Sequence, residues 1–231
     1  MSWREFWNAD TPIYVNDRHK FVHYQRVAKD IEKLSPGPDA RVVDYGCGEA
    51  LAAGSLAARC GHLYLCDGAE IVRDRLRQRL TAVANTTILS PEEFDTVPDR
   101  SIDLVVVNSV VQYLSKDQLD ACLTQWHRKL NASGRLVVAD VIPPGIGPLT
   151  DATALLRFAA ANGFLIAALA GLVRTFFSDY RRVRAQLGLA HYSESEFLKV
   201  LRDAGFTAQR MSWNFGHNSA RMAFEARGAA S

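Results

Sequence analysis

Residues 42–50, VVDYGCGEA, constrain the fold of this chain more than any other stretch. An apolar strand runs into a glycine turn here, and an alanine-rich helix is expected from residue 50 to residue 60. Gly46 and Gly48 can adopt backbone angles that other residues avoid, and they let a ligand lie against the main chain. The free N–H groups at the start of the helix would face that ligand. The stretch therefore predicts the strand-turn-helix unit of an α/β fold, with a ligand at the turn.

An acidic residue beside the turn limits which ligand fits. Asp44 stands two residues before Gly46, and Leu51 stands three residues after Gly48, where a dinucleotide-binding turn would carry Gly or Ala. A carboxylate repels the pyrophosphate of a dinucleotide but attracts an ammonium or sulfonium group. The sequence therefore favours a cationic ligand at this turn.

A second acidic residue follows the next predicted strand. Residues 62–66 are a short apolar run, and Asp67 comes directly after it, nineteen residues beyond Gly48. A carboxylate at the end of the second strand can accept hydrogen bonds from both ribose hydroxyls of a bound nucleoside. Asp67 is therefore expected to bind a ribose.

The motif Asp44-x-Gly46-x-Gly48, with Asp67 at this spacing, resembles two motifs of class I S-adenosylmethionine-dependent methyltransferases. Two positions depart from the family pattern: Ala50 replaces the third glycine, and Ser90 replaces the acidic residue that meets the adenine amino group. Glu92 or the backbone would have to make the adenine contact. The resemblance implies S-adenosyl-L-methionine as the cofactor, with contacts from Asp44, Gly46, Cys47, Gly48, Asp67, Gly68, Glu92, Asn108 and Ser109.

The resemblance spans residues 39–142 and 191–226, and it implies a fold. The fold is an α/β, Rossmann-like, seven-stranded, mostly parallel sheet with a C-terminal antiparallel hairpin and helices on both faces. Residues 207–213 and 220–226 are the strands expected for the hairpin. A single domain of 231 residues is expected, made of an N-terminal lid and helix (1–38), a cofactor-binding core (39–142), a helical insertion or cap (143–190), and a last helix with the hairpin (191–231).

The segment after the fourth predicted strand indicates the kind of acceptor. Strand 102–108 is followed by SVVQYL, whereas methyltransferases that flip a base out of nucleic acid often carry Asn/Asp-Pro-Pro-Tyr/Phe at this place. The segment resembles that of small-molecule methyltransferases. A formal net charge of +2 indicates no strong overall field, so no nucleic-acid partner is expected.

The insertion has an unusual composition. Between residues 150 and 177 the only bases are Arg157 and Arg174, and the run 158–173 carries no charge. That run is shorter than the roughly 20 residues that a membrane-spanning helix needs. Two interpretations are a cap over an apolar substrate pocket and a peripheral membrane patch over 150–184, whose arginines 181, 182 and 184 meet anionic head groups. The alternatives are helices that bury each other and a homodimer contact.

Candidate catalytic residues lie on both sides of the predicted core. Residues 1–24 are rich in aromatic side chains and include Tyr14, and they resemble the lid of small-molecule methyltransferases, with Asn16 as the cap of the following helix. His191 lies where the insertion rejoins the sheet. An amine acceptor must arrive neutral, whereas a hydroxyl acceptor needs a base within hydrogen-bond reach. Tyr14 and His191 are therefore the residues expected to act near the transferred methyl group.

Cysteine usage and the N-terminus indicate the compartment. The four cysteines form no C-x-x-C pair, which predicts reduced thiols and no metal site. The charged N-terminus lacks the apolar run of an export signal, so a cytoplasmic protein is expected.

The expected function is an S-adenosylmethionine-dependent methyltransferase acting on a small molecule with an apolar or lipid-like part. An RNA or protein methyltransferase and a non-catalytic S-adenosylmethionine-binding module are the alternatives.

Overall fold

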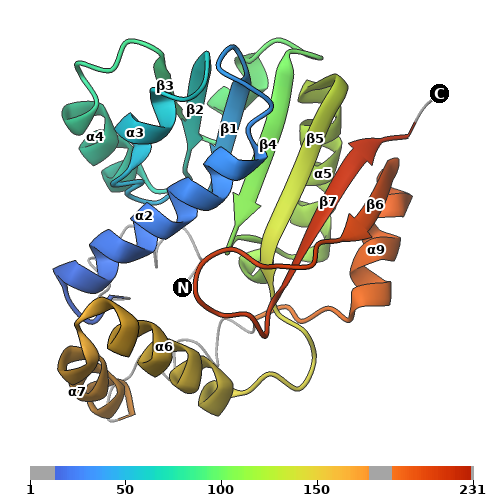
Figure 1. Cartoon of the computed structure of the whole chain (residues 1–231). Coiled ribbons are helices and arrows are strands. Elements are labelled where there is room, and N and C mark those ends of the chain that lie inside the picture. Colours follow the sequence, from blue (N-terminus) through green and yellow to red (C-terminus); the bar gives the residue numbers. More distant parts are fainter. Residues whose placement is uncertain (1–13, 177–188, 230–231) are drawn as a thin grey trace.

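The structure, a computed structural model, describes residues 14–176 and 189–229. Its centre is a seven-stranded sheet in the order β3-β2-β1-β4-β5-β7-β6 (Figure 1). Strands β1 to β5 run parallel, and β7 runs antiparallel to both β5 and β6. The predicted Rossmann-like fold with its C-terminal antiparallel hairpin is therefore confirmed. The strands are β1 (Arg41–Tyr45), β2 (His62–Cys66), β3 (Thr86–Leu89), β4 (Ile102–Asn108), β5 (Leu130–Val141), β6 (Phe206–Arg210) and β7 (Met222–Gly228).

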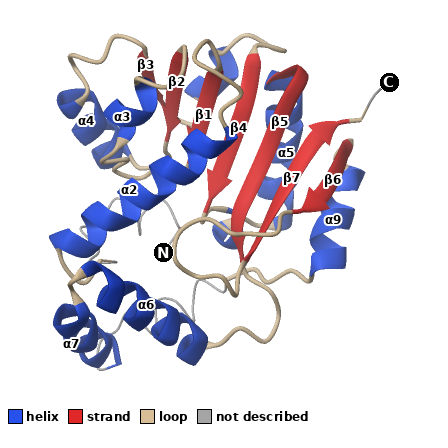
Figure 2. Cartoon of the chain, viewed as in Figure 1, coloured by secondary structure: helices blue, strands red, loops and turns tan. Residues whose placement is uncertain are grey.

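Helices cover both faces of this sheet (Figure 2). One face packs against α5 and α9, with Trp126 and Phe197 fully buried, and the other packs against α2, α3 and α4, with Ile31 and Leu76 buried. The described helices are α2 (Asp17–Leu34), α3 (Ala53–Ala57), α4 (Glu70–Arg79), α5 (Lys116–Lys129), α6 (Pro148–Asn162), α7 (Leu165–Phe176) and α9 (Glu194–Asp203), with 3₁₀ turns η1 (Glu93–Thr96) and η2 (Val111–Tyr113).

Side-chain caps open three of the described helices, and the predicted cap at Asn16 is one of them. The Asn16 side chain accepts a hydrogen bond from the His19 N–H, and capping boxes at Ser115 and Ser193 open α5 and α9. Ser90 and Glu93 also form reciprocal hydrogen bonds, but only the short turn η1 follows them. Helix α2 runs unbroken from residue 17, so residues 17–24 of the predicted lid are its first turns, and residues 1–13 lie outside the described chain.

The helix expected over residues 50–60 is wrong in its length. Ala50 takes a left-handed backbone angle, φ 37°, and helix α3 covers only Ala53–Ala57. The chain then turns into β2 at Gly61, where a Cβ atom would lie 2.5 Å from the Asp39 carbonyl oxygen. The tight entry to β2 and the exit from the glycine turn leave room for little more than one helical turn.

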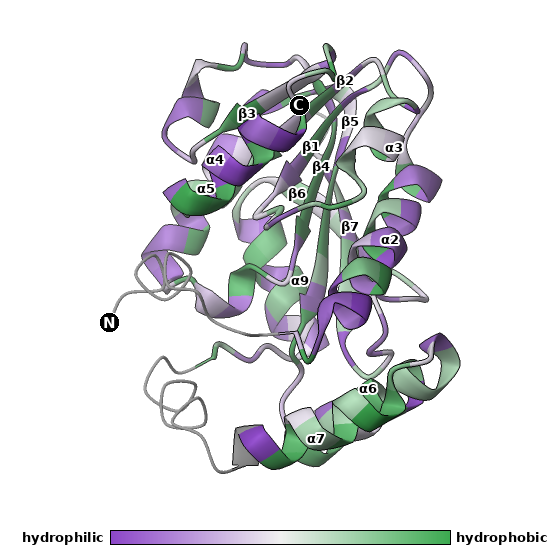
Figure 3. Cartoon of the chain, turned by 90° about the vertical axis from the view of Figure 1, so that its left-hand side faces the viewer, coloured by the Kyte–Doolittle hydropathy of each residue, from purple (hydrophilic) through white to green (hydrophobic). Residues whose placement is uncertain are grey.

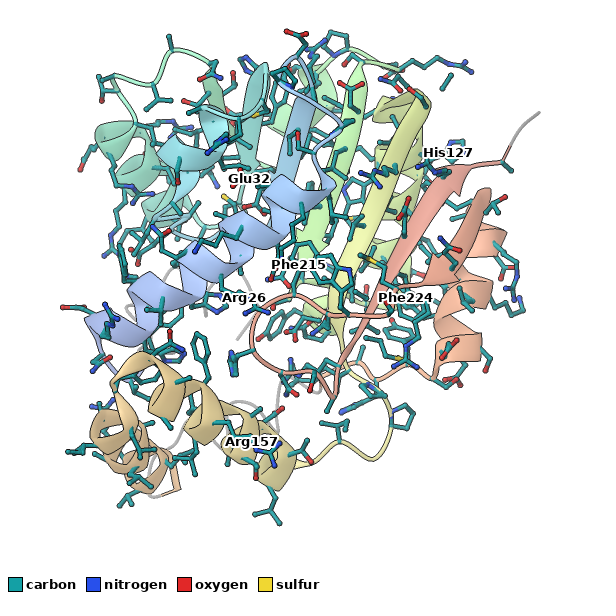
Figure 4. The ribbon with its side chains drawn as sticks, viewed as in Figure 1. Arg26, Glu32, His127, Arg157, Phe215 and Phe224 are labelled. Atoms are coloured by element: carbon teal, nitrogen blue, oxygen red, sulfur yellow. The ribbon has the colours of Figure 1, made fainter. Side chains whose placement is uncertain are left out.

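A long connection joins β6 to β7 and crosses the carboxyl end of the sheet. Strand β6 ends at Arg210, earlier than expected, because residues 211–221 bind other elements. The Asn214 side chain accepts from the Asp140 N–H at 2.9 Å, and the Gly216 N–H donates to Asp30 of α2 at 3.2 Å. Phe215 is buried with α2 on the same face (Figure 4). The connection therefore belongs to the wall of the site.

Helices α6 and α7 form a cap beyond the carboxyl ends of the parallel strands, beside the start of α2 (Figure 1). Gly163, at φ 76°, ends α6 in a left-handed conformation. Phe164 and Ala168 are buried between the two helices, and Arg18 of α2 donates to the Asn162 carbonyl at 3.1 Å. Figure 3 shows how apolar both helices are. Within the described chain, no helix combines the length and the apolar character needed to cross a bilayer.

Candidate active site

The carboxyl ends of β1, β2, β4 and β5 open into one cavity of about 530 Å³. Its position is where strand order reverses between β1 and β4, the place at which open α/β sheets bind ligands. The strand ends supply one wall. Helix α2, the segment after β4 and the β6–β7 connection supply the other walls.

The turn after β1 is shaped by its two glycines. Gly46 has φ 76° and Gly48 has φ 55°, angles that other residues rarely adopt. A Cβ atom on Gly46 would lie 2.2 Å from Val110 Cγ2, and one on Gly48 would lie 2.5 Å from the Tyr24 hydroxyl. Both positions therefore require glycine for the angle and for the close approach of a neighbouring chain segment.

Asp67 holds this turn in place from the end of β2. Its Oδ2 accepts from the Gly48 N–H at 2.9 Å, and its Oδ1 accepts from the Ala69 N–H at 2.9 Å. Burial raises the pKa of the Asp67 carboxyl. Each carboxylate oxygen keeps a further lone pair, so the side chain can still accept from two ligand hydroxyls.

The N–H groups after the turn are not open to a ligand as the sequence led us to expect. The Gly48 N–H is bonded to Asp67, and the Glu49 N–H donates to the Tyr24 hydroxyl at 2.9 Å. Helix α3 starts only at Ala53. Ligand binding at this turn therefore depends on the carboxylates and the close main chain, because α3 is too short to provide an anion site.

Asp44 lies at the end of β1 with its carboxyl group buried. Burial and, second, the neighbouring Asp67 raise the pKa of Asp44 to about 7. A positively charged ligand beside the two carboxylates would favour the ionised form. This wall of the cavity therefore fits a cation, in agreement with the expectation from sequence.

The structure brings most of the predicted site residues to the cavity. Its lining includes Tyr14 and the expected cofactor residues Asp44, Gly46, Cys47, Gly48, Asp67, Gly68, Asn108 and Ser109. Glu92 and His191 are exposed and are not among the lining residues, whereas Pro91, next to Glu92, is. The sequence pattern therefore predicted the cavity residues around the glycine turn, but it wrongly placed His191, where the insertion rejoins the sheet, at the cavity.

A cluster of rings on α2 forms another wall of the cavity, and it includes the lid candidates His19 and His23. His19 and His23 are one helical turn apart and both face the cavity with Tyr24. The Tyr14 ring centroid lies 5.5 Å from that of His23, and the His217 centroid lies 6.3 Å from that of His19. Burial, with the nearby His217, lowers the pKa of His19 to about 4 and that of His23 to about 3.

The sequence pattern did not reveal a polar network at the ends of β4 and β5. Ser109 Oγ donates to Asp140 Oδ2 at 2.7 Å, and Arg221 Nη1 donates to the same oxygen at 2.8 Å. Arg221 also bonds both carboxylate oxygens of Asp151 on α6 at 3.1 Å. Asp140, Arg221 and Gln112 of η2 all line the cavity. These residues are far apart in sequence, so no local motif marks them.

The cysteines take no part in metal binding or disulfides in the described residues. Cys47, Cys60, Cys66 and Cys122 are free thiols, and the described part of the chain groups no three His, Cys, Asp or Glu side chains around a metal position.

Comparison with known proteins agrees with this geometry. Residues 43–138 match the model of a family described as "Methyltransferase domain". No curated protein matches the chain.

Solved structures with the same fold include methyltransferases of several kinds. Mitomycin 7-O-methyltransferase has a TM-score of 0.64 at 21% identity, covering 99% of this chain and 61% of that one. A putative methyltransferase of Haloferax volcanii, in complex with its Trm112 activator, has a TM-score of 0.62 at 16% identity over 100% and 99% of the two chains. Magnesium protoporphyrin IX methyltransferase from Synechocystis PCC 6803 with bound SAH has a TM-score of 0.59 at 16% identity over 98% and 93%. Residues 43–138 thus match a methyltransferase-domain family, and the chain has the fold of the class I S-adenosylmethionine-dependent methyltransferases.

Proposed function

We propose that this methyltransferase acts on a small molecule with an apolar part. The observation that carries the proposal is the cavity of about 530 Å³, in which the glycine turn and Asp67 face a wall of buried and half-buried rings from α2 and the β6–β7 connection. Such a volume is typical of sites for small ligands. Mitomycin 7-O-methyltransferase and the magnesium protoporphyrin IX enzyme, both of similar fold, are named for small-molecule acceptors.

The residues at the turn fit S-adenosylmethionine. Asp67 would accept from the ribose hydroxyls, and Asp44 would face the positively charged end, while Gly46 and Gly48 keep side chains out of the way. When bound, the cofactor supplies a methyl group on a sulfonium, which is transferred by in-line displacement. The protein aligns the acceptor and excludes water, for which the rings of Tyr14 and His23 are well placed.

The outer face of α7 favours an apolar partner. Leu165, Ile166, Leu169 and Val173 are 40, 85, 49 and 60% exposed, and they form one stripe along the helix. The opposite face carries Ala168 and Gly171, which pack inward. An uninterrupted apolar stripe facing solvent usually marks an interaction site.

Charge around this stripe points to an anionic lipid surface as the partner. Arg157 and Arg174 are exposed and form no ion pair with the described residues; Arg157 lies on α6 (Figure 4), and Arg174 follows Val173 of the stripe in the last turn of α7. Cations next to an apolar helix face favour anionic head groups. The arginines at 181, 182 and 184, predicted to belong to the same patch, lie outside the described residues.

A double substitution tests both parts of this proposal. We expect Ile166→Glu with Leu169→Glu to abolish flotation with vesicles of phosphatidylglycerol and phosphatidylcholine. Methylation of long-chain acceptors held in those vesicles should fall at least about tenfold, while S-adenosylmethionine affinity is unchanged. Ile71→Glu, at an exposed apolar position on α4 away from the cap, is the control and should behave as wild type.

Two results would contradict the proposed binding of the α7 stripe to an anionic lipid surface. One is equal vesicle flotation by the double variant and by wild type. The other is a wild-type dimer in light scattering that the double variant converts to a monomer without any effect on lipid, because the stripe would then be a subunit interface.

A further inference from the structure

Asp140 occupies a special place at the carboxyl end of β5. Its backbone angle is φ 63°, and Ser109, at the end of neighbouring β4, has φ 59°. Left-handed angles at non-glycine residues cost energy and are concentrated at functional sites. Both residues line the cavity, and they are joined by the 2.7 Å hydrogen bond from Ser109 Oγ to Asp140 Oδ2. The backbone is therefore strained at both residues, at the point where this carboxylate reaches the cavity.

Only one oxygen of this carboxylate is used by the protein. Oδ2 accepts from Ser109 and from Arg221, whereas Oδ1 accepts no hydrogen bond from any described residue. The side chain is only 15% exposed, and burial raises its pKa even though Arg221 opposes the rise. Because Asp140 lines the cavity, its Oδ1 can accept a hydrogen bond from a ligand there.

The sheet order separates Asp140 from the glycine turn and from Asp67, whereas its partner Ser109 is an expected cofactor contact. Gly46 and Asp67 stand at the ends of β1 and β2, and Asp140 stands on β5, on the other side of β4. Neighbouring strands lie about 4.8 Å apart, so the backbone of Asp140 starts roughly 10 Å from the glycine turn, on the side away from Asp67. The ligand that meets Asp140 is therefore the methyl acceptor.

The surrounding charges restrict that acceptor. Arg221 is the one permanent cation that lines the cavity among the described residues, and it is shared between Asp140 and Asp151. Burial lowers the pKa of His217, as it does those of His19 and His23, so the three imidazoles carry no charge at neutral pH. No described cation is left to balance a carboxylate or phosphate on the acceptor.

We propose that Asp140 Oδ1 accepts a hydrogen bond from an N–H or O–H group of the methyl acceptor, and that the acceptor group bound there is neutral or cationic, an amine or hydroxyl rather than an acid. This inference rests on the proposed function, since it names the acceptor class of the same site. It makes Asp140 an acceptor-binding residue, distinct from the residues that hold the cofactor.

A matched series of ligands tests the proposal without relying on turnover. Octylamine, 1-octanol and octanoate share one apolar chain and differ in the polar group, and their binding can be measured by calorimetry with the S-adenosylhomocysteine-saturated protein. We expect wild type to bind octylamine and octanol at least tenfold more tightly than octanoate. Asp140→Asn should remove the preference for octylamine and raise octanoate affinity. Asparagine tolerates left-handed angles, so this variant is expected to fold, and its melting temperature checks that.

Asp151→Asn is the control, because Asp151 shares Arg221 but does not line the cavity. It should keep the wild-type order of the three ligands. Equal binding of all three by wild type, a preference for octanoate, no binding of any of them, or the same change in both variants would each overturn the proposal. Failure of wild type to bind S-adenosylmethionine would instead contradict the proposed function.

Discussion

Asp44 shows how one buried side chain can make cofactor binding depend on pH. Its pKa is raised to about 7, by burial first and then by Asp67, so near neutrality it is partly protonated in the ligand-free protein. The sulfonium and ammonium groups of S-adenosylmethionine favour the ionised carboxylate. Cofactor affinity should therefore follow the ionised fraction of Asp44.

We expect S-adenosylmethionine affinity to fall about tenfold between pH 8 and pH 6, because the ionised fraction of a group with pKa near 7 falls by that factor. Asp44→Asn should bind more weakly at pH 8 and should show a nearly flat profile. Calorimetry at three pH values measures both. A wild-type profile as flat as that of the variant would show that Asp44 does not face the cationic part of the cofactor.

The same pKa shift affects stability with a definite sign. The folded pKa of Asp44 lies above the ordinary value of 3.8, so the stability that this group contributes is fully present below about pH 4 and is lost as pH rises through 7. At pH 8 the ionised, buried carboxylate destabilises the ligand-free fold. Asp44→Asn should accordingly melt at a higher temperature than wild type at pH 8, with a smaller gain at pH 6.

At the scale of elements, alanine substitution should have opposite effects on stability at two glycines, one in the turn after β1 and one in α3. Gly46→Ala places a Cβ atom 2.2 Å from Val110 Cγ2 at a φ of 76°, so it should destabilise the protein by at least about 1–3 kcal/mol and weaken cofactor binding. Gly54→Ala adds a Cβ atom in open space within α3, and it should stabilise by roughly 0.5–1 kcal/mol. Urea unfolding of both variants checks this. Equal effects would mean that the turn is not held as described.

Elements set by local chemistry could be predicted from the sequence, and those set by distant contacts could not. The caps at Asn16, Ser115 and Ser193 depend on residues three positions apart, and the predicted cap at Asn16 is present. The shortness of α3 depends on how Gly61 meets the Asp39 carbonyl, and the early end of β6 depends on what the next residues bind. Neither relation is visible along the chain.

The candidate site divides in the same way. The glycines and Asp67 lie in short motifs around the first two strands, so their place in the cavity could be anticipated. Asp140 and Arg221 are 81 residues apart and meet only because β7 lies next to β5. His191 lies where the insertion rejoins the sheet, but its side chain is exposed and does not line the cavity.

On the scale of the whole molecule, the cavity lies at the carboxyl edge of the sheet, and none of its lining residues comes from the described helices α6 and α7 of the cap. The ends of β1 and β2 hold the glycine turn and the two acids proposed to bind the cofactor, and the ends of β4 and β5 hold Ser109 and Asp140. The cap is tied to the sheet by Asp151 with Arg221, and to α2 by Arg18 with the Asn162 carbonyl (Figure 1). The cap therefore contacts α2 and the segment before β7, and the outer face of α7 presents the apolar stripe to solvent.

The central claim is that S-adenosylmethionine binds at the Gly46–Gly48 turn with its ribose on Asp67, and calorimetry tests it most directly. Asp67→Ala removes charge-assisted hydrogen bonds worth about 1.5–3 kcal/mol, so the Kd should rise roughly 10- to 150-fold. Asp74→Ala, an exposed acid on α4, is the control and should bind as wild type does. Unchanged affinity in Asp67→Ala, or tighter binding of a nicotinamide dinucleotide than of S-adenosylmethionine by wild type, would contradict the account.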